Sequence, residues 1–118
     1  MNALETYKEI SVTTQTKGRL VVMLYDGAIK FLRQAVNEIE AGNPEAKGIC
    51  ITKALNIIDE LNVVLDMESG GEVAENLRKL YVFMVKHLNE ANIKQDAGKI
   101  NEVINLLDEL NQGWKAIA

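Results

Sequence analysis

The single histidine of this sequence, His87, is the first residue whose type suggests chemistry. A histidine beside the apolar face of a helix suggests a phosphorylatable group, as in four-helix histidine phosphotransfer domains. Those domains usually carry a lysine three residues after the histidine and then a glycine, whereas this chain has Glu90 and Ala91. A carboxylate-bridged metal site would need a glutamate three residues before the histidine, and that position is Met84. We therefore interpret His87 as a boundary side chain and keep phosphotransfer as an alternative.

The other candidate reactive groups are Cys50 and two pairs of adjacent carboxylates. Cys50 lies in an apolar run, and an apolar setting favours an unreactive thiol, so we expect a structural role. The carboxylates of Asp59 and Glu60, and of Asp108 and Glu109, are sequence neighbours. Because adjacent helix residues project about 100° apart, we expect these pairs on solvated faces rather than in an acid–base dyad. The sequence predicts no enzyme, no metal site and no cofactor.

Length, charge and cysteine content limit the function further. The chain has 118 residues with 47% hydrophobic and 25% charged side chains, which is typical of one globular domain. Its formal net charge of −4 does not suit nucleic-acid binding, because that needs a basic surface. A lone cysteine favours a reducing compartment. Since neither a signal peptide nor an apolar run of membrane-spanning length is visible, we expect a cytoplasmic protein without membrane insertion.

Helical periodicity dominates the sequence, and a single proline interrupts it. Apolar residues recur at helical spacing over residues 19–41, 44–67, 72–95 and 99–117. The connections are only a few residues long, which forces neighbouring helices to pack antiparallel. We therefore expect an all-α fold, an antiparallel up-down-up-down four-helix bundle over residues 19–118. Residues 1–18 are expected to form a mobile N-terminal leader that ends at Gly18.

Apolar side chains exceed what a bundle core requires, mainly on the second and third predicted helices. A core face needs a stripe somewhat wider than about 100°, and Ile57, Val64 and Phe83 lie at or beyond its edge. We expect these side chains, with Leu61 at the floor, to form a partner-binding groove between those two helices. Such grooves accept amphipathic helices. A homodimer that buries the same surface is the alternative.

Several motifs resemble those of the FliS family, the flagellar secretion chaperones for flagellin. Residues 24–32, LYDGAIKFL, resemble the opening signature of the family, and residues 53–84, KALNIIDELNVVLDMESGGEVAENLRKLYVFM, continue the pattern. The tail over residues 88–114 extends it, so the resemblance covers nearly the whole chain. Tyr7 matches a tyrosine of the family's leader. One departure is Lys17-Gly18, because family members often have a proline just before the first helix.

The resemblance implies a cytoplasmic four-helix chaperone that binds the disordered C-terminal segment of newly made flagellin in apolar grooves. Such a chaperone keeps flagellin from polymerising early and delivers it to the flagellar export apparatus. The resemblance also implies that the N-terminal segment can occupy a groove before the client arrives. In this chain, we expect that segment to cap the groove through Leu4, Tyr7 and Ile10. A weak homodimer remains open.

Overall fold

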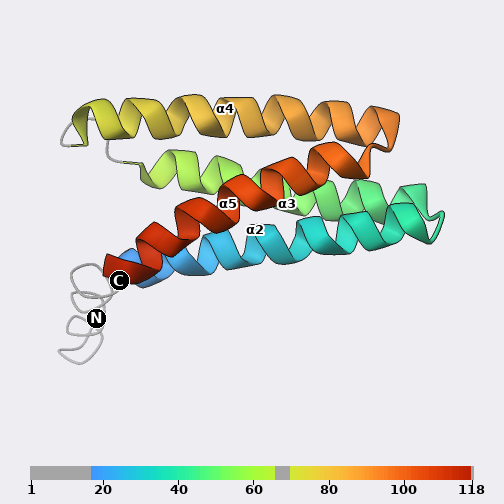
Figure 1. Cartoon of the computed structure of the whole chain (residues 1–118), viewed down its shortest axis with the longest axis horizontal. Helices are drawn as coiled ribbons and strands as arrows, with labels where there is room; N and C mark the ends of the chain where they lie inside the picture. Colours follow the sequence, from blue (N-terminus) through green and yellow to red (C-terminus); the bar gives the residue numbers. More distant parts are fainter. Residues whose placement is uncertain (1–16, 66–69, 118) are drawn as a thin grey trace, which may run out of the picture.

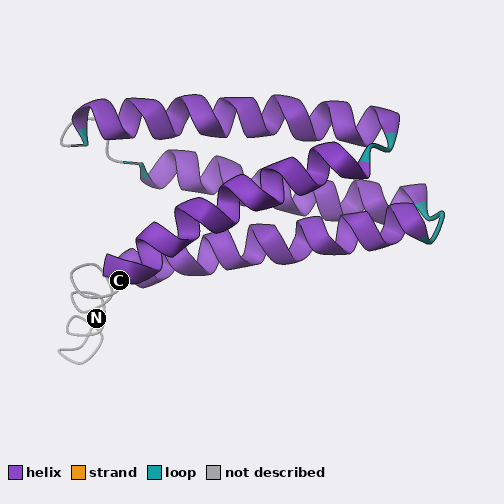
Figure 2. Cartoon of the chain, in the orientation of Figure 1, coloured by secondary structure: helices purple, strands orange, loops and turns teal. Residues whose placement is uncertain are grey.

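The computed structural model describes residues 17–65 and 70–117, and every regular element within them is an α-helix (Figure 2). The helices are α2 (Lys17–Glu40), α3 (Pro44–Val64), α4 (Gly71–Lys94) and α5 (Ala97–Ile117). Each helix lies against the one that follows it, and α5 also lies against α2, which closes a ring (Figure 1). The described residues therefore confirm the predicted all-α up-down-up-down bundle.

A glycine turn joins α2 to α3. Gly42 adopts a left-handed φ of 75°, which costs glycine little because it has no Cβ. Its N–H donates to the carbonyl of Ile39 (3.1 Å), and the N–H of Asn43 donates to the carbonyl of Glu38 (2.9 Å). These two bonds satisfy carbonyls that the end of α2 would otherwise leave unpaired. Pro44 then starts α3, where its missing N–H costs no helical bond.

The end of α3 and the start of α5 differ from the sequence-based expectation. Helix α3 ends at Val64 rather than at residue 67, because Leu65 already has an extended backbone with φ −69° and ψ 123°. Helix α5 begins at Ala97 rather than at residue 99. The carboxylate of Asp96 accepts the backbone N–H of Lys99 (3.2 Å), as an N-terminal capping residue does. The segment predicted as a turn therefore supplies the cap and the first residues of the helix.

Helix α2 begins at Lys17, so Gly18, which we expected to mark the end of the leader, lies in its first turn. Residues 1–16 lie outside the described residues. The division into a leader and a bundle, and the capping role of Leu4, Tyr7 and Ile10, therefore stay predictions.

All four helices contribute to one buried core. Its largest fully buried apolar side chains include Tyr25, Leu32, Ile58, Leu88 and Leu107. Two polar residues are buried as well, Lys47 and Asn111. The ammonium of Lys47 donates to the backbone carbonyl of Asn92 (2.8 Å), which ties α3 to the end of α4. No helix in the described part of the chain is both long enough and apolar enough to cross a membrane.

Candidate functional site

Helix α5 crosses the bundle obliquely, and polar contacts near its start hold that part on α4 (Figure 1). Lys99 Nζ donates to Glu90 Oε2 (2.6 Å), and Glu102 Oε2 lies within hydrogen-bond distance of His87 Nε2. The hydrogen bond from Lys99 lowers the pKa of Glu90, and the same bond raises the pKa of Lys99. Both charges are therefore favoured, and the first half of α5 stays beside the second half of α4.

The second half of α5 is held on α2 instead. Asn111 Nδ2 donates to Asp26 Oδ1 (2.8 Å), and Lys115 Nζ lies 3.5 Å from the same oxygen. Asn111 is 1% exposed, and its own Oδ1 has no hydrogen-bond partner among the described residues. As α5 approaches α2 it leaves α4, so the bundle opens between the first half of α4 and the second half of α5.

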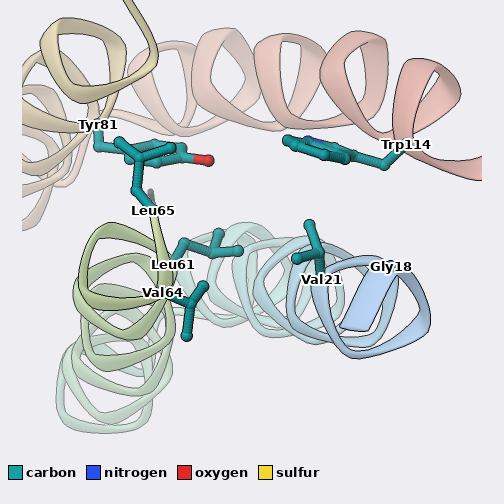
Figure 3. Close-up of a pocket in the computed structure, with 7 residues that line it drawn as sticks. All are labelled: Gly18, Val21, Leu61, Val64, Leu65, Tyr81 and Trp114. Carbon is teal, nitrogen blue, oxygen red and sulfur yellow. The ribbon is translucent and has the colours of Figure 1, made fainter. Parts of the chain in front are cut away.

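An apolar pocket of about 290 Å³ lies at this open end of the bundle, which we call the end pocket (Figure 3). It is lined by Gly18, Val21, Leu61, Val64, Leu65, Tyr81 and Trp114. The aromatic rings of Tyr81 and Trp114 lie on one side, facing the aliphatic side chains of α2 and α3 (Figure 3). None of these lining residues is charged, so the pocket suits apolar side chains of a binding partner.

Two buried tyrosines meet beside the end pocket. The hydroxyl oxygens of Tyr25 and Tyr81 are 2.6 Å apart, so one hydroxyl donates to the other. Burial raises the pKa of Tyr81, and its hydrogen bond to Tyr25 raises it further. Burial also raises the pKa of Tyr25, although its side-chain hydrogen bonds with Tyr81 and Trp114 oppose this shift. Both hydroxyls therefore keep their protons at neutral pH.

Comparison with known proteins identifies the family. The sequence profile described as "Flagellar protein FliS" matches residues 1–118. The chain belongs to the FliS family. The flagellar secretion chaperone FliS of Salmonella typhimurium is 39% identical over 99% of this chain and 90% of its own length. The proteins of the same name from Vibrio cholerae (39% identity, 98% and 88% coverage) and Bacillus subtilis (38%, 97% and 84%) are similarly close.

Residues of the motifs that resemble FliS help to pack the helices and to line the end pocket. Asp26 anchors the second half of α5 through Asn111. A Cβ at Gly27 would lie 3.3 Å from Cδ1 of Ile57, so glycine there lets α2 and α3 approach closely. Tyr81 lines the end pocket. These positions of the FliS pattern therefore have structural reasons in this chain.

The four residues that we expected to form one FliS client groove lie on different faces. Leu61 and Val64 line the end pocket, whereas Ile57 is partly buried beside Gly27 of α2. Phe83 is 43% exposed and stacks on His87, with ring centroids 4.8 Å apart, beside α5 rather than α3. Helical periodicity does not tell which neighbouring helix each of these side chains faces. Their part in client binding stays a prediction.

The residues considered for chemistry have structural partners in this FliS chain. The side chain of His87 is 15% exposed and bonded to Glu102. Cys50 Sγ lies 3.9 Å from Gln34 Oε1, and the cysteine is partly buried against the core. Among the described residues, no three metal-binding side chains are grouped. The boundary role of His87 and the structural role of Cys50 stay predictions.

Four other residues line the end pocket, namely Val21, Leu65, Tyr81 and Trp114. Their helical spacing matches the buried stripes, so periodicity alone does not single them out. A usable signal is their position along the chain. In an antiparallel bundle, the start of the first helix meets the ends of the second and fourth. Val21 lies near the start of α2, Leu65 directly follows α3, and Trp114 lies near the end of α5.

Proposed function

We propose that this chain is a cytoplasmic flagellar secretion chaperone that binds the disordered C-terminal segment of flagellin, with the end pocket as its main anchor. Membership of the FliS family supports the role, since its relatives are named flagellar secretion chaperones. The observation that carries the site is the uncharged pocket of about 290 Å³ built from all four helices. A cavity of this size takes a few large side chains, so it suits anchor residues of a client that continues over the surface.

The physical mechanism follows from the chemistry of such a client. Disordered, amphipathic flagellin ends would associate with one another through their apolar faces. Insertion of these faces into the end pocket hides them, while the ordering entropy that the client loses limits affinity and permits release. We propose that release occurs by competition at the flagellar export apparatus and that the chain itself catalyses no reaction.

Titration of the full chain with the flagellin C-terminal segment tests this function. The segment is expected to bind saturably, and flagellin that lacks it is expected not to bind. Binding of the truncated flagellin with equal affinity would mean that the client segment has been misassigned.

The leader gives a second prediction, because Lys17 starts α2 directly at the end pocket and Gly18 lines it. We propose that residues 1–16 cap the pocket in the free protein through Leu4, Tyr7 and Ile10. A cap that fills the pocket from half to nine-tenths of the time lowers apparent affinity about two- to tenfold. Deletion of residues 1–16 is therefore expected to tighten client binding by that factor, measured by calorimetry. Loss of binding by a deletion variant that keeps its helical circular dichroism would instead make the leader a client contact.

A further inference from the structure

The end pocket contains one polar group whose role folding alone does not explain. Of its lining side chains, only those of Tyr81 and Trp114 carry a nitrogen or oxygen atom. The hydroxyl of Tyr81 points from α4 toward Trp114, over the aliphatic side chains of α2 and α3 (Figure 3). Tyr81 itself is 2% exposed, and Tyr25, its hydrogen-bond partner, is 0% exposed and is not among the residues that line the pocket. Tyr81 is therefore the hydroxyl that an occupant of the pocket can reach.

The hydroxyl pair has one proton more than its own bond uses. Each tyrosine hydroxyl has one proton to donate, and the bond between Tyr25 and Tyr81 uses one of the two. Trp114 offers only an N–H donor, so it cannot accept the other. If Tyr81 donated to Tyr25, the proton of Tyr25 would be left in the interior without an acceptor among the described side chains. The favoured arrangement has Tyr25 donating to Tyr81, because an unpaired buried donor is costly.

We propose that Tyr81 is a specificity-determining residue whose hydroxyl donates a hydrogen bond to a carbonyl oxygen of the client segment in the end pocket. This inference rests on the proposed function and adds a polar requirement to an otherwise apolar site.

The acceptor is a neutral carbonyl, either of the backbone or of an amide side chain. No cation is among the described residues that line the pocket, so a client carboxylate buried there would lack a compensating charge. A carbonyl oxygen near the end of a client helix is well suited, because the last turn of a helix leaves its carbonyls without intrahelical partners. The site thus selects an apolar anchor next to a free carbonyl and disfavours an acidic one.

The test compares Tyr81→Phe with Tyr25→Phe, each titrated calorimetrically with the flagellin C-terminal segment. Both variants remove the same internal hydrogen bond and are expected to lower stability, Tyr81→Phe more strongly, because it leaves the buried proton of Tyr25 without an acceptor. Only Tyr81→Phe also removes the donor that faces the client. We expect it to weaken binding about tenfold, because the client carbonyl is then buried without a partner. Tyr25→Phe leaves the Tyr81 proton free to bind the client, so its affinity is expected to stay within about threefold of the unsubstituted chain.

The double variant Tyr25→Phe/Tyr81→Phe separates a loss of stability from the loss of the hydrogen bond to the client. It leaves neither hydroxyl, so it is expected to be more stable than Tyr81→Phe, in which the proton of Tyr25 has lost its acceptor, and to bind as weakly as Tyr81→Phe. Equal affinity losses for the two single variants would overturn the inference, because the pair would then act only through the fold. Unchanged binding by Tyr81→Phe would also overturn it. Absence of binding by the unsubstituted chain would contradict the proposed function itself.

Discussion

Replacement of Val64 by aspartate is expected to lower affinity for the flagellin C-terminal segment at least about 30-fold, while the bundle stays folded. Val64 lines the end pocket and is partly exposed in the free protein, so the carboxylate remains hydrated until the client binds. In the complex it would be buried among uncharged side chains without a cation. Such a penalty is about 2 kcal/mol or more, which corresponds to the stated loss of affinity. Calorimetric titration alongside thermal melts separates binding from folding.

The matched control for this variant is Val63→Asp. Val63 precedes Val64 on α3, is 71% exposed and does not line the end pocket. The same change there is expected to leave both stability and affinity nearly unchanged, since surface substitutions usually stay within about ±0.5 kcal/mol. Equal losses of affinity for the two variants would indicate that a negative charge anywhere on this part of α3 weakens binding, whether or not it lies in the end pocket. Normal binding by Val64→Asp would place the client on another surface, with Phe83 as the next position to change.

A substitution at Ile57, which was predicted as a client contact together with Val64, does not separate binding from folding. Its side chain is partly buried and lies where α2 and α3 approach closely at Gly27. Ile57→Asp is therefore expected to lower the melting temperature as well as any affinity. A binding loss without a stability loss at Ile57 would show that the client reaches this face.

Asn111→Asp is expected to lower the free energy of unfolding by about 3 kcal/mol at neutral pH. Asn111 is 1% exposed and donates to the carboxylate of Asp26. Aspartate would remove that donor and place a buried carboxylate beside the exposed carboxylate of Asp26, and an uncompensated buried charge typically costs about this much. Because protonation removes the added charge, the loss of stability is expected to shrink as the pH falls below neutrality. Urea unfolding at two pH values measures both effects.

The control on the same helix is Asn105→Asp, because Asn105 is exposed. The same chemical change there is expected to alter stability by no more than about 0.5 kcal/mol. If Asn111→Asp is equally mild, the contact between Asn111 and Asp26 does not hold α5 on α2, and the origin of the end pocket must be sought elsewhere.

The four helices could be predicted from sequence because periodicity and turn residues are local signals. Gly42 and Pro44 marked the turn between α2 and α3, and the structure shows why each residue suits its position. The end of α3 was predicted three residues too late, since Val64 and Leu65 continue the apolar pattern although the backbone of Leu65 is already extended. The apolar pattern indicates which side chains are buried rather than which residues are helical, and Leu65 still packs against the core after α3 has ended.

The site was less predictable because it depends on the path of α5. That path is set by contacts between residues far apart in sequence, such as Asp26 with Asn111. A helical wheel places Val64 and Phe83 off the core stripe, but the packing of the four helices decides that Val64 lines the same pocket as Trp114 and that Phe83 lies beside Lys99 of α5. Tyr81 and Trp114 have the spacing of core residues and become pocket residues only because the bundle opens at that end.

The most direct test of the account is calorimetric titration of the full chain with the flagellin C-terminal segment at several temperatures. Burial of apolar surface gives a negative heat-capacity change on binding. We therefore predict saturable binding with a clearly negative heat-capacity change, and a marked loss of affinity in Val64→Asp but not in Val63→Asp. Saturable binding with a heat-capacity change near zero, or equal affinities for the two variants, would contradict an apolar client anchored in the end pocket.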